Sequence, residues 1–274
     1  MYKDMQAPVL ESVDDAKVAL TSVNIDAILN NLLGEVTIRQ TYENIENKNI
    51  EAVYTFPLPI HAVLLDMRIK IGARELKGVV VEKSEAEEKY EDAITDGDTA
   101  IMLERLETGL YTMNVGNLMP NEKVEISFTY AELYRWQNSS LRFFMPTTIA
   151  PKYGDPESVC IEPHQIPEHS LTKDNPFQIR LTIHGLLQDA SLKSPSHKIE
   201  IQKDPGATII NLADREALMD RDFILNIHSD STEKNFAIID KDIDGYAVLT
   251  SFNPKFPAVT KKSPRSIKIV VDRC

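Results

Sequence analysis

Hydrophobic and polar residues alternate one by one over several stretches of this chain. Successive side chains of a β-strand point to opposite faces, so each such stretch predicts a strand with one apolar and one polar face. Antiparallel sheets often have one face exposed to water, whereas the strands of parallel sheets are buried on both faces and are apolar throughout. The clearest runs are residues 36–39, 65–71, 124–130 and 177–183, and weaker ones are 52–56, 101–103, 141–145, 223–227 and 246–252. The sequence therefore predicts a mainly β fold of one or two antiparallel sandwiches.

One stretch follows a helical period instead. Between residues 84 and 95 the apolar side chains recur at the spacing of one helical face. Ser84 and Glu87 have the spacing of a capping box, in which hydroxyl and carboxylate each accept a free amide of the first turn. The Asp-Gly pair at 96–97 ends the helix. We predict one short helix at about 84–95 and a second, shorter one at 213–219.

A proline-rich stretch divides the chain. Six prolines lie between residues 146 and 176, and because proline has no backbone N–H to donate, such a stretch is typical of an extended connection. We therefore predict a β domain at residues 1–150, a proline-rich connection at 151–175, a second β-rich unit at 176–255, a linker at 256–266 and the first strand of a truncated domain at 267–274.

Acidic residues outnumber basic ones. The chain has 42 Asp and Glu against 30 Lys and Arg, a net charge of −12, and it would repel the phosphates whose neutralisation supplies most nucleic-acid affinity. We therefore expect no nucleic-acid partner. Residues 82–107 hold ten acidic and three basic residues, whereas residues 255–274 are basic. Both are best interpreted as solvated surfaces, and the alternative is that they attract one another or a neighbouring domain.

Cysteine content and hydropathy bear on the compartment. The two cysteines, Cys160 and Cys274, are too few for a disulfide-stapled secreted scaffold. No stretch approaches 18 apolar residues, and the first residues lack the apolar core of a signal peptide. We expect no membrane span, and we favour the cytoplasm without being able to assign the compartment.

No catalytic constellation stands out in the sequence. His164 and His169 lie in the proline-rich stretch near carboxylates and the lone thiol of Cys160, but neither HExxH nor paired CxxC spacing is present. No Gly-x-Ser-x-Gly elbow and no phosphate-binding loop occurs. The residues alone therefore favour a protein that is not an enzyme. The alternative is a hydrolase or transferase that uses His164 and His169 in a cleft between the two β units.

Two further patterns allow a ligand. Asp92 with the Asp-Gly-Asp of 96–98 resembles part of a calcium loop, but Leu103 stands where the twelfth-position glutamate belongs. Tyr134 and Trp136 flank an arginine, and this cluster could stack a sugar, which would make the chain a glycan-binding β-sandwich. A strand end is the simpler interpretation of the aromatic pair.

The ordered set of segments resembles the VIT domain family, the module of vault and inter-α-trypsin inhibitor heavy-chain proteins. The matching segments are 23–25, 41–44, 54–59, 86–93, 114–118, 124–130 and 141–143, and 220–223 resembles the Asp-Arg-Asp element that follows in this family. The resemblance implies an antiparallel VIT sandwich, and it implies a non-catalytic protein-interaction scaffold that positions a following von Willebrand A domain. Protein partners and that A domain are the implied partners.

The last residues resemble the start of such an A domain. Residues 267–272 form an apolar run that ends in Asp272, as the first strand of a doubly wound α/β domain does. In A domains this aspartate and two serines hold Mg²⁺. The resemblance makes Asp272 the one metal-ligand candidate, but Cys274 replaces the first serine, and a thiol suits Mg²⁺ poorly. We expect no cofactor in this chain, and Mg²⁺ only in a complete A domain.

Large aromatic residues are expected to fill the core of the VIT sandwich rather than to bind a cofactor. These residues are Phe56, Tyr90, Tyr111, Phe128 and Phe143.

Overall fold

The computed structural model describes residues 10–12, 18–72, 74–78, 89–93, 95, 101–107, 110–137, 139–147, 177–214, 217–231 and 235–252. Strands dominate these residues, which confirms the predicted mainly β fold. The chain divides into two compact units, Met1–Asp230 and Ser231–Cys274, and each is described by itself.

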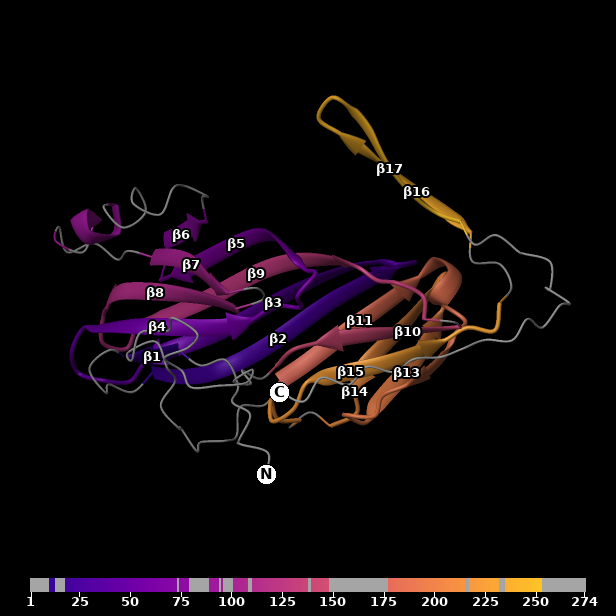
Figure 1. Ribbon diagram of the computed structural model, residues 1–274. Coiled ribbons are helices and arrows are strands. Elements are labelled where there is room, and N and C mark those ends of the chain that lie inside the picture. The colour runs from indigo at the N-terminus through magenta and orange to yellow at the C-terminus, as the bar shows by residue number, and fades with distance from the viewer. Residues whose placement is uncertain are drawn as a thin grey trace, which may run out of the picture. The chain divides into compact units, whose positions relative to one another are not determined.

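An eight-stranded sheet is the frame of the first unit (Figure 1). Its order is β13-β14-β11-β2-β3-β9-β5-β6, and all neighbours are antiparallel except β11 and β2, which are parallel. The strands are β2 (Val18–Asn30), β3 (Leu33–Asn44), β5 (Val63–Ile71), β6 (Arg74–Lys77), β9 (Lys123–Leu133), β11 (Phe177–His184), β13 (Ile199–Asp204) and β14 (Ala207–Leu212).

Two smaller sheets complete this unit. One has the order β1-β4-β8-β7 and the other β10-β15-β12. Their strands are β1 (Leu10–Ser12), β4 (Ile50–Pro57), β7 (Ile101–Glu107), β8 (Leu110–Leu118), β10 (Ser140–Met145), β12 (Ser191–Lys193) and β15 (Phe223–His228), and a 3-10 turn, η3 (Gly185–Leu187), follows β11.

Both smaller sheets pack on the same face of the large sheet. Ile179, Ile25, Ile38 and Phe128 are paired in one row across β11, β2, β3 and β9, so their side chains share a face. The first small sheet contacts this face through Phe56 of β4, whose ring centroid lies 4.5 Å from that of Phe128. The second small sheet contacts the same face near β11, as the next paragraph describes. On the opposite face, the described side chains of β2, β3, β9 and β11 are exposed or half-buried.

The second core is centred on a histidine. Phe177 stands two residues before Ile179 and therefore on the same face. Its ring centroid lies 5.4 Å from that of His197, which in turn lies 5.8 Å from that of Phe223 on β15. One sheet thus carries two cores side by side along its length.

The predicted division at the proline-rich connection does not separate two sheets. Strand β11 pairs with β2 over eight residues and, with β14 and β13, extends the sheet that β2, β3, β9 and β5 form. Strand β10, from before the connection, pairs with β15, from after it. Alternation of polar and apolar residues specifies which face of a strand is buried, but it does not specify the neighbouring strand, and the parallel pairing lay outside the prediction.

The predicted helices have different outcomes. Within 84–95, residues 89–93 and 95 are helical and the others lie outside the described residues. Residues 213–219 are not helical at any described position. This second prediction was wrong because Ala217 and Met219 are buried as part of an irregular segment, and the Ala217 carbonyl accepts a hydrogen bond from the Phe177 amide at 2.9 Å.

Most of the predicted core aromatic residues are buried. Phe56, Phe128 and Phe143 are fully buried, and Tyr111 stacks on Phe56 with ring centroids 5.7 Å apart. Tyr90 differs, because it is only half-buried and its hydroxyl donates to Glu51 Oε1 at 2.8 Å. Its role includes this polar contact as well as packing.

The second unit contains one hairpin among its described residues. Strands β16 (Phe236–Asp242) and β17 (Gly245–Ser251) pair antiparallel over their whole length. The predicted linker at 256–266 and the predicted strand at 267–274 lie outside the described residues.

Candidate functional site

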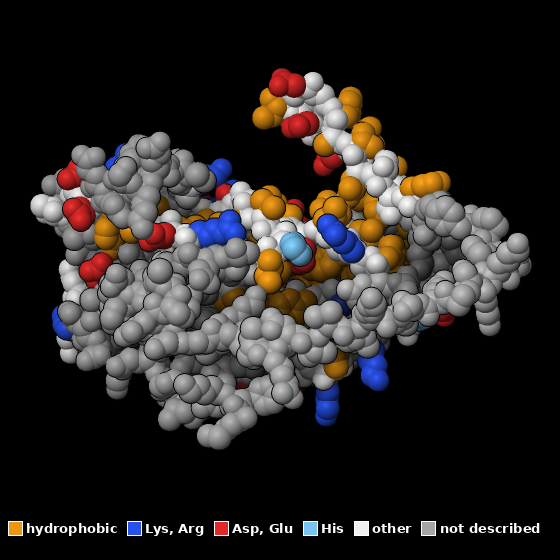
Figure 2. Space-filling model, in the orientation of Figure 1, with side chains coloured by type: hydrophobic (Ala, Val, Ile, Leu, Met, Phe, Trp, Pro, Cys, Tyr) orange, Lys and Arg blue, Asp and Glu red, His pale blue; other side chains and the backbone are white. Residues whose placement is uncertain are grey.

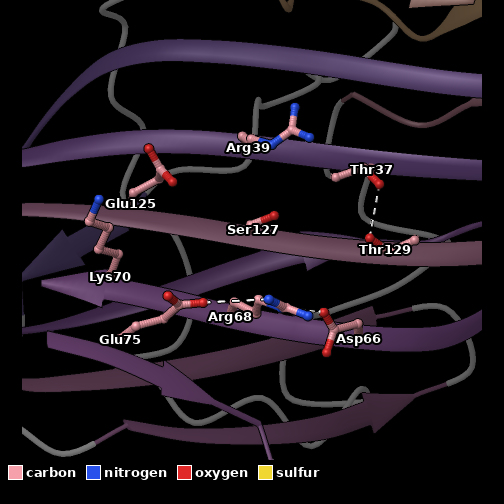
Figure 3. A pocket seen from close by; sticks show the side chains of 9 residues that line it. All are labelled: Thr37, Arg39, Asp66, Arg68, Lys70, Glu75, Glu125, Ser127 and Thr129. Atoms are coloured by element: carbon pink, nitrogen blue, oxygen red, sulfur yellow. Dashed lines mark hydrogen bonds and ion pairs between the residues drawn. The ribbon is translucent and has the colours of Figure 1, made fainter.

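The solvent-facing side of the large sheet carries a polar hollow of about 410 Å³ (Figure 3). Four neighbouring strands line it, and each contributes every second residue, as the strand period requires. The lining residues are Thr37 and Arg39 of β3, Glu125, Ser127 and Thr129 of β9, Asp66, Arg68 and Lys70 of β5, and Glu75 of β6. We call this set the outer-face hollow.

Hydrogen bonds and ion pairs cross the strands in the outer-face hollow. The hydroxyls of Thr37 and Thr129 are 2.9 Å apart. Arg68 Nε donates to Asp66 Oδ2 at 2.7 Å, and its terminal nitrogen lies 3.6 Å from Glu75 Oε1. The Asp66 contact raises the pKa of Arg68 above its ordinary value. The guanidinium is therefore charged at any pH at which the protein is handled.

The outer-face hollow is lined by charged and hydroxyl side chains. Three basic and three acidic side chains line it, together with three hydroxyls, and no histidine or cysteine does. Side chains of Arg68 and Glu75 are more than half exposed, so their ion pair contributes at most about 1 kcal/mol. Such pairs exchange at low cost for charges of an approaching protein. The lining offers no base next to a nucleophile of the kind that covalent catalysis needs.

A polar cluster lies on the opposite face at the end of β9, where Tyr130 and Glu132 belong to the strand and Tyr134 follows it. Burial raises the pKa of Glu132, and the hydroxyl of Tyr134 and the charge of His61 lower it in part. Tyr130 is fully buried, and burial together with Glu132 raises its pKa far above the usual range. This cluster was not predicted, although the sequence contains a signal for it: Glu132 stands two residues after Tyr130 and so falls on the core face of β9, where a carboxylate is unusual.

Tyr134 is not available as a sugar platform. It is 6% exposed, and its ring centroid lies 5.6 Å from that of Phe143. The ring also lies against Gly34 of β3, where an added Cβ would come within 2.6 Å of Tyr134 Cε2. Trp136 is half-buried. The glycan-binding alternative therefore loses its main residue. The simpler prediction, a strand end at this position, is correct, because β9 ends at Leu133.

The Asp-Arg-Asp element ties the two halves of the chain together. Asp222 Oδ1 accepts a hydrogen bond from the Thr147 amide at 3.0 Å, and the Thr147 hydroxyl donates to the Arg221 carbonyl at 2.7 Å. Asp220 forms a two-pronged pair with Arg221, both distances being 2.8 Å. The sequence singled out this element by resemblance alone, and its role as the clamp on the end of β10 was not predicted.

Several predicted site residues lie outside the described residues. These are Cys160, His164, His169, the aspartates of 96–98, Asp272 and Cys274. Among the residues that are described, no group of three or more His, Cys, Asp and Glu side chains has the arrangement of a metal site. The Mg²⁺ ligand role of Asp272 stays a prediction.

Residues 20–130 match the family model of the vault protein inter-alpha-trypsin domain, VIT. This match confirms the resemblance inferred from the sequence. It covers β2 to β9, which include the central strands of the large sheet and strands β4, β7 and β8 of the first small sheet.

Curated relatives extend the similarity beyond this segment. Protein mono-ADP-ribosyltransferase PARP4 of Mus musculus is 26% identical over 80% of this chain and 11% of its own length. The von Willebrand factor A domain-containing protein 5A of Rattus norvegicus is 26% identical over 89% of this chain and 32% of its own length. A von Willebrand factor A domain-containing protein of Dictyostelium discoideum is 35% identical over 41% of this chain and 12% of its own length. The chain thus spans a third or less of each of these relatives.

Solved structures resemble the chain only distantly. An M1 zinc metallopeptidase from Deinococcus radiodurans gives a TM-score of 0.39 at 10% identity, covering 84% of this chain and 45% of the other. Aminopeptidase A of Legionella pneumophila gives a TM-score of 0.37 at 13% identity, covering 88% and 25%. A likeness of this size establishes neither fold nor function. Among the described residues, no helix is long and apolar enough to cross a lipid bilayer.

Proposed function

We propose that this chain is a non-catalytic protein-interaction module that positions a following von Willebrand A domain. The family match and the A domain-containing relatives support an interaction role. In the proposal, the A domain begins at the strand predicted for 267–274, and Asp272 provides its first Mg²⁺ ligand.

The continuous sheet is the observation that carries this proposal. Residues from Val18 to Leu212 contribute to one sheet whose single covered face holds both cores. A domain anchored to such a sheet is held by a rigid frame, because sliding one strand by a residue would turn its buried side chains to solvent. Such a rigid sheet is better suited to holding an A domain in one position than to acting as a hinge.

The outer-face hollow is the surface that we assign to the A domain. It lies on the uncovered face, and its mixed charges suit the polar rim of a protein interface. Exposed apolar residues at one end of the same face supply contact area, namely Ile28, Val63, Leu65 and Leu133. Apolar contact area ringed by polar residues marks protein-interaction surfaces.

The test uses the longest natural chain that contains this sequence and an A domain. NMR relaxation should give one rotational correlation time for both parts, and Arg68→Glu should separate it into two. Lys203→Glu, on the far edge strand β13, is the control because it reverses the charge of an exposed side chain that lies outside the outer-face hollow and pairs with Asp189 at 3.9 Å. Independent tumbling in the unsubstituted protein would refute the positioning role. Coupled tumbling in Arg68→Glu would refute only the assignment of the surface.

A further inference from the structure

Glu132 occupies an unusual place for a carboxylate. Figure 2 shows acidic side chains at the surface on one face of the molecule. Glu132 instead stands on the core face of β9, and its Oε2 atom is buried although the residue as a whole is half-buried. A carboxylate is rarely buried without a partner. The groups around this oxygen therefore decide what the position can bind.

Two tyrosine side chains are the neighbours of Glu132. Tyr130 stands two residues earlier on the same face of β9 and is fully buried. The ring of Tyr134 lies against Gly34, which is the cross-strand partner of Glu132, so this ring is next to the carboxylate. Burial raises the pKa of both tyrosines, and the charge of Glu132 raises it further. The three side chains therefore form one cluster.

The oxygens of this cluster are neighbours that do not bond to one another. Tyr130 Oη, Glu132 Oε2 and Tyr134 Oη are buried, and none has a hydrogen-bond partner in the part of the chain that the structure describes. Burial raises the pKa of Glu132 and the Tyr134 hydroxyl lowers it in part, although their contact falls short of regular hydrogen-bond geometry. The large majority of buried polar side-chain atoms are bonded to protein or to ordered water. Water commonly bridges polar groups that lie just too far apart for a direct bond.

We propose that one internal water molecule binds at the end of β9 and bridges Tyr130 Oη, Glu132 Oε2 and Tyr134 Oη. A buried water typically makes about three hydrogen bonds, which is what this cluster offers. Water both donates and accepts, so it can meet two hydroxyls and a carboxyl group at once. The bridge joins core residues of β9 to Tyr134, which follows the strand, and so fixes the direction in which the chain leaves β9 toward β10.

The observations favour water over a metal cation as the occupant. Burial of Glu132 disfavours the charged carboxylate that a cation needs, and the charge of His61 offsets this only in part. Two hydroxyls and one carboxyl oxygen also fall short of the roughly six to eight oxygen ligands that Ca²⁺ takes. Among the described residues, no group of three or more His, Cys, Asp and Glu side chains could hold a metal. A neutral occupant suits a neutral carboxyl group.

Magnetic relaxation dispersion of water tests the proposal on the chain of 274 residues, because it counts the water molecules that a protein holds for longer than it takes to tumble. The double variant Tyr130→Phe/Glu132→Met removes two of the three partners and should lower this count by about one. Glu132→Gln is the matched control, because a neutral amide of the same size keeps a hydrogen-bonding oxygen, and its count should equal that of the unsubstituted chain. Circular dichroism verifies that each variant is folded.

A crystal structure of the unsubstituted chain keeps the test decisive if the double variant does not fold. It should show one water within about 3.2 Å of all three oxygens. Direct hydrogen bonds among the three oxygens, or an ion at about 2.3–2.6 Å from them, would overturn the proposal. An unchanged water count in the folded double variant would also overturn it. So would a lower count in Glu132→Gln, because the bridge would then depend on a charged carboxylate.

Discussion

The two cores on the large sheet differ in the residues that form their central contacts. Between β4 and β9 the contact is made by Phe56 and Phe128, with Tyr111 stacked on Phe56, and no titratable acid or base takes part in it. Between β11 and β15 the corresponding contact runs through His197, held between Phe177 and Phe223. The contact of the first core is one between aromatic rings, whereas that of the second passes through a histidine and therefore also depends on the protonation state of His197.

The hydrogen bonds of the second core lie at its rim. Ser196 Oγ contacts His197 Nδ1 at 3.0 Å and accepts the Ile224 amide at 2.9 Å, and Asp222 holds the Thr147 amide. Of these bonds, the one between Thr147 and Asp222 joins parts of the chain on opposite sides of the segment 148–176, as the pairing of β10 with β15 also does. The second core is therefore where the parts of the chain before and after this segment meet, and its stability should respond to substitution of Asp222 and, through His197, to pH.

Removing a ring from the first core should have the largest effect. Phe128 is 2% exposed and contacts the ring of Phe56, so Phe128→Ala leaves a cavity and should lower the free energy of unfolding by about 3–5 kcal/mol. Urea denaturation followed by circular dichroism measures this. Ser127→Ala, the neighbouring residue on the outer face, is the control and should cost less than about 1 kcal/mol. Full stability of Phe128→Ala would mean that β9 does not present this face to the core.

Much of this fold could be predicted from the alternation of residues. The runs at 124–130 and 177–183 became β9 and β11, with their apolar residues buried. Strand β5 shows where the rule fails. Leu65 alternates with Met67 as if both were buried, but a register shift between Leu64 and Asp66 leaves Leu65 54% exposed. A bulge adds one residue to a strand, so the residues before it point to the face opposite to the one that simple alternation predicts.

The candidate surfaces were harder to predict than the strands. The outer-face hollow joins residues from 37 to 129 whose polarity only indicated a wet face, and nothing in the sequence indicated that four such strands are neighbours. The clamp between Asp222 and Thr147 joins residues 75 positions apart. Contacts of this kind depend on strand order, which alternation does not determine.

Breaking the clamp should have an intermediate effect on stability. Thr147 is 1% exposed, so Asp222→Ala leaves its amide without the Asp222 acceptor in a buried place, and this should lower the free energy of unfolding by about 1–3 kcal/mol. Asp220→Ala is the control, because its carboxylate forms an ion pair with the exposed side chain of the adjacent Arg221, and it should cost less than about 1 kcal/mol. If the two variants lose equal stability, the clamp is not what distinguishes the second core.

The smallest effect, and the one specific to the second core, is its pH dependence. Burial lowers the pKa of His197 below its ordinary value of 6.5, and the charge of Arg221 lowers it further, while Asp220 opposes them. The folded state thus favours the neutral imidazole. Just below pH 6.5 the unfolded chain binds a proton at His197 more readily than the folded chain does. The contribution of His197 to stability is therefore complete above pH 6.5 and is lost as the pH falls below that value.

Denaturation across this pH range should show that the free energy of unfolding decreases as the pH falls, and His197→Gln should make this decrease smaller. His228→Gln removes an exposed imidazole of the same small sheet and controls for the loss of one titrating group. If the slope is unchanged in His197→Gln, protonation of His197 does not contribute to the pH dependence of stability.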